Sequence, residues 1–123
     1  MHKIRFYKDK NGRQPVKEFL DDLKKKNDKS SRIRLNKAND YIQALAQYGA
    51  TLGEPYMKKI DDKHNIWELR PCSDRIFFVA WVNDTYMLLH VFQKKTQKTP
   101  EREKEQARRE VKDLMERGQD NEE

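Results

Sequence analysis

The apolar residues of this chain change their spacing near residue 50, and this change restricts the possible folds more than any other feature. Between residues 14 and 49 they recur three or four positions apart, which is the period of amphipathic helices. From residue 55 to residue 94 they alternate with polar residues or form short apolar runs, as in β-strands. Residues 2–8, HKIRFYK, also alternate. The sequence therefore predicts one strand, then helices, then a sheet.

Two helices are predicted within residues 14–49, joined by the polar segment KKKNDKSS at residues 24–31. Ser30 or Ser31 is the expected N-cap of the second helix, because a side-chain hydroxyl can accept a hydrogen bond from a free backbone N–H. Gly49 is expected near its end, since glycine readily adopts the conformation that ends many helices. The two helices are expected to form an αα-hairpin.

Four strands are predicted in the second half of the chain, at residues 55–61, 66–70, 75–82 and 86–94. The turns between them are short, which predicts antiparallel pairing in a meander.

Thr99 is expected to cap a last helix, with Pro100 at its first position. Its apolar stripe is predicted to contain Ala107, Val111, Leu114 and Met115, and residues 118–123 are expected to form a frayed tail. We therefore predict one α+β domain over residues 1–123. An antiparallel sheet carries the helical hairpin on one face, and the other face is left free to form a groove.

The balance of charged residues favours a polyanionic partner. The chain has 123 residues, a net charge of +6 and a pI of about 9.4, which suits contacts to phosphate groups. A protein that is merely rich in surface lysine gives the same numbers. No signal peptide or apolar run of about 20 residues is present, so a cytoplasmic protein without a membrane partner is expected.

Few cofactor or metal sites are compatible with the sequence. The glycine-rich phosphate loop of ATPases, the glycine fingerprint of dinucleotide-binding folds and the His and Cys spacings of zinc sites are all missing. The single cysteine, Cys72, excludes an internal disulfide and is expected to be a small packing residue at a strand end. We therefore expect no cofactor and no metal ion.

Basic and polar residues gather on the predicted meander, where strand ends and a helix start meet on one side of the sheet. The candidate catalytic residues are His64, Glu68, Arg70, Arg75, His90, Lys94 and Lys95. The candidate RNA-binding residues are Lys58, Lys59, Phe92, Gln93 and Lys98. Structural alternatives are Glu68 and Arg70 as cross-strand ion-pair partners at the surface, Arg75 as a solvated rim residue, His90 as a core histidine, and the lysines as an ordinary charged strand end.

Such a set of residues suits metal-free cleavage of RNA. The 2′-hydroxyl attacks the adjacent phosphorus, arginine and lysine stabilise the charge that develops, and Glu, His or Lys transfers protons. Aromatic residues can stack an unpaired base. Many basic proteins carry similar residues, and a noncatalytic module that binds RNA or the ribosome remains an alternative.

Two segments make the chain similar to a known family. IWELRPCSDRIFFVAW at residues 66–81, followed by YMLLHVFQKKTQKTPEREKEQA at residues 86–107, resembles the HigB-like branch of the RelE/ParE toxin superfamily. The first strand and helical hairpin also fit this family. The resemblance implies a toxin of a type II toxin–antitoxin pair, a metal-free endoribonuclease that cuts mRNA in the ribosomal decoding site. A ParE-like gyrase poison has the same fold and is the alternative within the superfamily.

The resemblance also assigns partners and residue roles. It implies a cognate antitoxin with a helix-turn-helix domain, and contact with operator DNA only through that antitoxin. Arg75 matches the arginine that contacts the scissile phosphate, Lys94 and Lys95 match the basic pair of the last strand, and Arg70 matches a residue that is catalytic or structural. Residues 96–123 contain no Tyr or His, unlike some relatives, so the general acid and base are not transferred. In the family, the last helix can cover the groove or be displaced by the antitoxin.

Overall fold

The computed structural model describes residues 1–118, and the greater part of the expected tail, residues 119–123, lies outside the described residues. The helices and strands follow the predicted order. They are β1 (Lys3–Phe6), α1 (Pro15–Lys25), α2 (Lys29–Tyr48), the 3₁₀ turn η1 (Gly49–Leu52), β2 (Met57–Asp61), β3 (Ile66–Leu69), β4 (Asp74–Trp81), β5 (Thr85–Gln93) and α3 (Glu101–Glu116).

The five strands form one mixed sheet in the order β1-β5-β4-β3-β2. Strands β2 to β5 pair antiparallel, which confirms the predicted meander. Strand β1 instead lies parallel to β5, with Lys3 opposite Thr85 and Phe6 opposite Leu88. The sheet is therefore mixed and not wholly antiparallel as predicted. The helical hairpin and three strands separate β1 from β5 in the chain, so no short turn requires these two strands to pair antiparallel.

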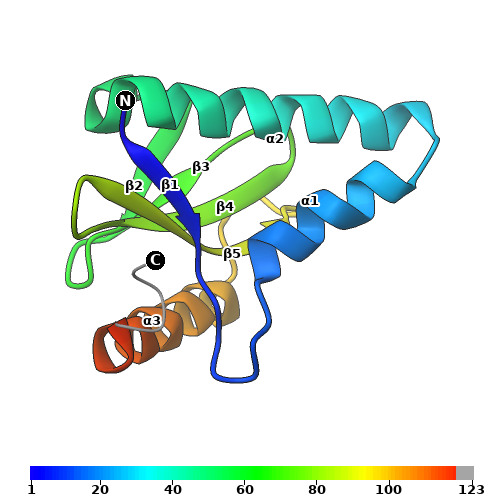
Figure 1. Cartoon of the computed structure of the whole chain (residues 1–123). Helices are drawn as coiled ribbons and strands as arrows, with labels where there is room; N and C mark the ends of the chain where they lie inside the picture. Colours follow the sequence, from blue (N-terminus) through cyan, green and yellow to red (C-terminus); the bar gives the residue numbers. More distant parts are fainter. Residues whose placement is uncertain (119–123) are drawn as a thin grey trace.

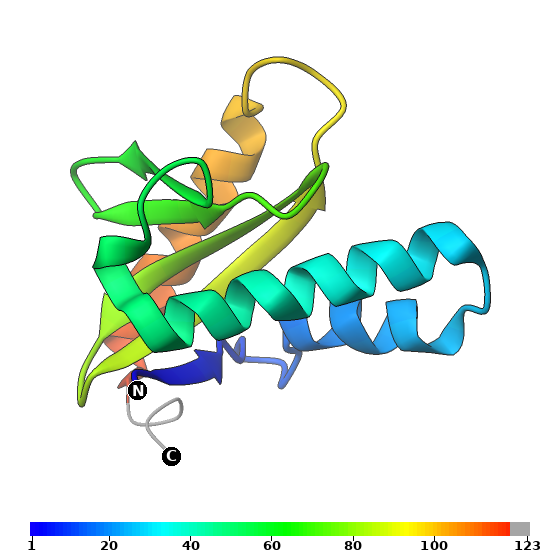
Figure 2. The same ribbon diagram turned by 90° about the horizontal axis from the view of Figure 1, so that it is seen from above.

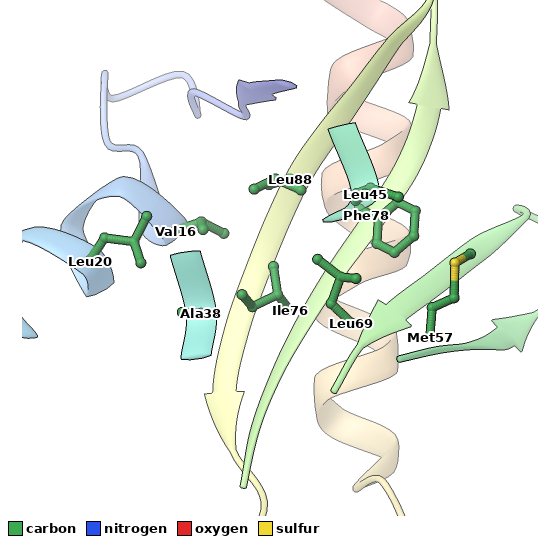
Figure 3. Packing of buried hydrophobic residues seen from close by; sticks show 9 residues of the cluster. All are labelled: Val16, Leu20, Ala38, Leu45, Met57, Leu69, Ile76, Phe78 and Leu88. Carbon is green, nitrogen blue, oxygen red and sulfur yellow. The ribbon is translucent and has the colours of Figure 1, made fainter. Parts of the chain in front are cut away.

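The helical hairpin covers one face of the sheet, as predicted (Figure 1). Figure 3 shows apolar side chains of α1 and α2 beside those of the strands. The residues of this core are Val16, Leu20, Ala38, Leu45, Met57, Leu69, Ile76, Phe78 and Leu88. Each is at most 8% exposed, so this layer supplies a large part of the hydrophobic stabilisation.

The opposite face of the sheet is covered by α3, so this face is not left free as expected (Figures 1 and 2). Ala107 and Leu114 are fully buried in a second core with Phe77, Met87 and Leu89. The helix is long enough to lie over several strands, and its apolar stripe requires a partner.

The ends of the helices differ from the sequence-based expectations. Asp28, and not Ser30 or Ser31, caps α2, since its carboxylate accepts a hydrogen bond from the Ser31 backbone N–H at 2.9 Å. Helix α3 begins at Glu101 after Pro100, and no side chain caps it, so the expected cap by Thr99 was wrong. Gly49 does end α2, with a φ of 58° and a space that His2 leaves too small for a Cβ atom.

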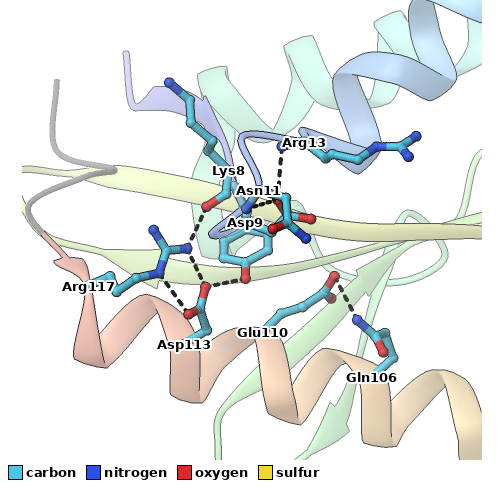
Figure 4. Close-up of polar contacts among 9 residues, drawn as sticks. Lys8, Asp9, Asn11, Arg13, Gln106, Glu110, Asp113 and Arg117 are labelled. Carbon is cyan, nitrogen blue, oxygen red and sulfur yellow. Dashed lines mark hydrogen bonds and ion pairs between the residues drawn. The ribbon is translucent and has the colours of Figure 1, made fainter.

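Polar contacts fasten the C-terminal half of α3 to the segment after β1 (Figure 4). Asp113 accepts hydrogen bonds from the Tyr7 hydroxyl and from Arg117, and Arg117 also donates to the backbone carbonyl of Lys8 at 2.9 Å. The Arg117 guanidinium lowers the pKa of Asp113 to about 2. Met115, expected in the apolar stripe, is 69% exposed, because the stripe of α3 turns away from it.

A buried carboxyl group makes the packing of α3 sensitive to pH. Glu110 is 4% exposed, and burial raises its pKa from an ordinary 4.5 to about 8, against the opposing effects of Gln106 and Arg109. His90 Nδ1 lies 3.8 Å from a carboxyl oxygen of Glu110. Since this pKa lies above neutral pH, Glu110 is mostly protonated there and the contact is not a full ion pair.

We expect this carboxyl to destabilise the fold increasingly as the pH rises from about 4.5 to about 8. The unfolded chain releases the proton in this window while the folded chain retains it, so each pH unit lowers the free energy of unfolding by up to about 1.4 kcal/mol. Urea unfolding of Glu110→Gln and of the parent across this window measures the effect. The variant should lose most of the slope, and Glu105→Gln, on the exposed side of the same helix, should keep it. Parallel curves for Glu110→Gln and the parent would contradict the assignment.

Candidate functional site

Two adjoining hollows lie at one end of the sheet, beside the start of α3. The larger has a volume of about 790 Å³ and is lined by six cationic side chains, Lys58, Lys59, Arg70, Lys94, Lys98 and Lys104, together with Glu68 and Glu101. The smaller has a volume of about 470 Å³ and contains Arg75, Lys94 and Lys95. Both hollows include Lys94, Thr96 and Gln97. We call the two together the basic groove.

Strand ends and one connecting segment position the cations of the basic groove. Arg70 follows β3, Arg75 lies near the start of β4, and Lys94 follows β5, so the antiparallel order brings all three to one end of the sheet. The backbone N–H of Lys94 donates to the carbonyl of Ser73 at 2.7 Å, which joins the ends of β4 and β5. The segment from β5 to α3 forms a wall of the groove and projects beyond the sheet (Figure 2).

A buried carboxylate holds the two arginines. Glu68 is 2% exposed, and its Oε2 lies 3.5 Å from Nε of Arg70 and 4.0 Å from Nε of Arg75. Arg75 also donates to the backbone carbonyls of Cys72 and Asp74, at 2.8 and 2.9 Å. One carboxylate therefore faces two guanidinium groups, which leaves an excess of positive charge in a preorganised position.

Burial lowers the pKa of Arg75, while the charge of Glu68 opposes this effect and that of Arg70 adds to it. The guanidinium stays protonated in a protein because its ordinary pKa is so high. A partly buried charge of this kind is poorly compensated by water, and an anion in the groove would meet a strong local field.

A second buried ion pair fixes the start of β4 from the other face. Arg34 of α2 donates two hydrogen bonds to the carboxylate of Asp74, at 3.1 and 2.8 Å. Asp74 is fully buried and directly precedes Arg75. This pair has no signal in the sequence, since 40 residues separate its members and neither residue forms a local motif.

Most of the residues predicted for the site do meet in the basic groove. Glu68, Arg70, Arg75, Lys94, Lys95, Lys58, Lys59 and Lys98 all line one of the two hollows. Glu68 and Arg70 do approach one another as an ion pair, but the two residues are neighbours at the end of β3 and not partners across two strands, and Glu68 is buried.

The two candidate histidines lie outside the basic groove. His64 lies at the turn between β2 and β3, 3.5 Å from the Asp61 carboxylate, and lines a different hollow. His90 lies beneath α3, where its Nε2 is 2.7 Å from Glu103 Oε1. The alternative of a satisfied core histidine therefore describes the contacts of His90.

Two further predicted residues lie beside the groove without lining either hollow. Phe92 packs edge-to-face on Phe77 at 5.4 Å between ring centres, and Gln93 is exposed and donates to the Ser73 hydroxyl at 3.2 Å. Cys72 is exposed in a turn with a φ of 54°, so the expectation of a packing residue was wrong. A tight turn places its side chain in solvent.

Two charged residues of the groove were missed. Glu101 and Lys104 come from the first turn of α3 and line the larger hollow. Their spacing of three residues puts them on one face of the helix, which was a usable signal once the helix start was known.

The geometry can be compared with known families. A family model described as phage-derived protein Gp49-like (DUF891) matches residues 18–112, which include α2, the four-strand meander and most of α3. The chain belongs to this family. It is a family of type II toxins of the RelE/HigB-like kind, so the chain is a member of a toxin family whose proteins pair with a cognate antitoxin. The α+β architecture is consistent with a RelE-like fold. A search of curated proteins found no match.

Within residues 1–118, no group of three or more His, Cys, Asp or Glu side chains is arranged to hold a metal ion. No helix of this part is long and apolar enough to cross a membrane.

Proposed function

We propose that this Gp49-like protein is the endoribonuclease toxin of a type II toxin–antitoxin pair, closest in action to the HigB-like branch. The observation that carries the proposal is the convergence of Arg70, Arg75 and Lys94 around buried Glu68 in a groove lined largely by cations. Membership of a toxin family supports the biological role. Cleavage of mRNA on the ribosome, in the cytoplasm, is part of the proposal, as is an antitoxin that carries the DNA-binding domain of the pair.

The proposed reaction uses the RNA's own 2′-hydroxyl. Its oxygen forms a bond to the adjacent phosphorus, its proton passes to a base, and the bond from phosphorus to the 5′-oxygen breaks. The 5′-oxygen takes up a proton, so the products carry a 2′,3′-cyclic phosphate and a 5′-hydroxyl. Cations held in advance around the phosphoryl oxygens stabilise the charge that develops, without reorganising during the reaction.

The contacts suggest a division of roles. We assign Arg75, Lys94 and Lys95, the cations of the smaller hollow, to the scissile phosphate, and the lysines of the larger hollow to the flanking phosphates. Glu68 is too deeply buried to contact the RNA directly. We propose that it positions Arg70 and Arg75. Lys94, at the junction of the hollows, is suited to donating the proton to the 5′-oxygen.

Mapping the 5′ ends of a defined mRNA tests the proposal, with purified protein added in the presence and in the absence of translating ribosomes. We expect cuts at fixed positions within codons, and only with ribosomes. Cuts without ribosomes would support the nuclease activity but contradict its dependence on ribosomes. The absence of cuts in both conditions would reject the nuclease, and assays for trapped gyrase–DNA breaks and for simple RNA binding would then separate the two alternatives.

A further inference from the structure

A second groove, distinct from the basic groove, lies between the C-terminal half of α3, the turn that joins β2 to β3, and the end of β4. It has a volume of about 680 Å³ and a largely apolar floor that includes Val79, Trp81, Val111 and Met115. Met115 is 69% exposed, which is unusual for a large apolar side chain of a helix that otherwise packs well. We call this the α3 groove.

Cations surround the apolar floor of the α3 groove. Lys63, Arg109 and Lys112 lie at its rim and form no ion pair with residues 1–118. Arg108 also lines the groove, but its guanidinium forms ion pairs with Asp61 at 2.5 Å and with Glu101 at 3.0 Å. Glu116 is the only acidic residue among the described residues that line this groove. The rim therefore has unbalanced positive charge around an apolar centre. An apolar floor and a cationic rim together fit an amphipathic protein segment that has one apolar side and acidic residues beside it.

We propose that the α3 groove binds an acidic amphipathic segment of the cognate antitoxin. The apolar floor favours this occupant over RNA, because phosphates gain nothing from apolar side chains, and the cationic rim favours it over a second copy, because this chain is itself basic. The two grooves are separate places on α3, because Lys104 of the basic groove and Lys112 of the α3 groove are about 12 Å apart along the helix axis. The proposal rests on membership of the toxin family and not on the nuclease chemistry, so either can fail alone.

Two matched double variants test the surface with the full chain and its co-expressed cognate antitoxin. Met115→Glu with Lys112→Glu places acid in the α3 groove, and Ile33→Glu with Lys37→Glu makes the same change at exposed positions of α2. We expect the first to weaken antitoxin binding about 30-fold or more, as for the loss of an interface hot spot, and the second to leave it within about threefold. Both should keep the RNA cleavage of the parent. Equal affinities for the two variants would overturn the proposal.

A photo-crosslinking amino acid at position 115 identifies the occupant in the same complex. We expect a crosslink to an antitoxin peptide with apolar and acidic residues, and none from position 33. A crosslink to a second copy of the chain, to residues 119–123 or to RNA would overturn the proposal, as would an antitoxin peptide without acidic residues. The absence of RNA cleavage in the parent and in every variant, together with the expected difference in antitoxin binding, would count against the nuclease proposal alone.

Discussion

Replacing Arg75 with Gln is expected to lower the rate of RNA cleavage by about 10²–10³-fold. The guanidinium is held in advance by hydrogen bonds to the carbonyls of Cys72 and Asp74 and lies 4.0 Å from the Glu68 carboxylate, so its charge is in place before the transition state forms. Single-turnover rates on the mapped mRNA measure the effect. Arg75→Lys should recover part of the rate, because it keeps the charge but not the planar fork.

The control for this prediction is Arg32→Gln, which removes the same charge from an exposed position of α2. It should cleave within about twofold of the parent, since its charge is distant and screened by solvent. If Arg75→Gln abolishes toxicity in cells and leaves cleavage unchanged, toxicity does not come from the proposed reaction. If it weakens RNA binding only modestly and no cleavage is seen in the parent, the protein is a binding module.

Replacing Arg34 with Met is expected to lower the free energy of unfolding by about 3 kcal/mol. Asp74 is fully buried and receives both hydrogen bonds from Arg34, so the variant leaves a carboxylate without its counterion in the interior. The guanidinium carbon also lies 5.7 Å from the centre of the Phe19 ring, so the variant loses this cation–π contact as well, while methionine keeps an apolar stem of similar length.

Urea unfolding at neutral pH measures this loss. Arg32→Met, two residues earlier on α2 and exposed, should change the free energy of unfolding by no more than about 0.5 kcal/mol. A similar effect of the two substitutions would contradict the structural role of the Arg34–Asp74 pair. Arg34→Met should also reduce cleavage, because Asp74 fixes the backbone that carries Arg75.

Local patterns accounted for the elements of the fold but not for all of their pairings. The change of apolar period predicted the helical hairpin and the meander, because both depend on neighbouring residues. The parallel pairing of β1 with β5 depends on segments about 80 residues apart and has no local signal. Asp28 caps α2 in place of Ser30 or Ser31, because the helix begins at Lys29, a few residues before the start that the sequence suggested.

The candidate site was predicted to a similar depth. The antiparallel order of short strands predicted that Glu68, Arg70, Arg75 and Lys94 lie at one end of the sheet. In the structure these four residues line the two hollows of the basic groove. The position of α3 could not be derived from the sequence, and with it the contacts of His90 with Glu103 and the α3 groove. These depend on how a helix docks on a sheet, which side-chain spacing alone does not fix.

If the basic groove cleaves RNA through the 2′-hydroxyl, removing that single hydroxyl from the substrate must prevent the cut. An mRNA with a single 2′-deoxy nucleotide on the 5′ side of a mapped cut is compared with the unmodified mRNA. We expect cleavage at that position to disappear while other cuts persist, and the remaining downstream products to carry 5′-hydroxyl ends. Undiminished cleavage at the 2′-deoxy position, or downstream products with 5′-phosphate ends, would contradict cleavage by attack of the 2′-hydroxyl.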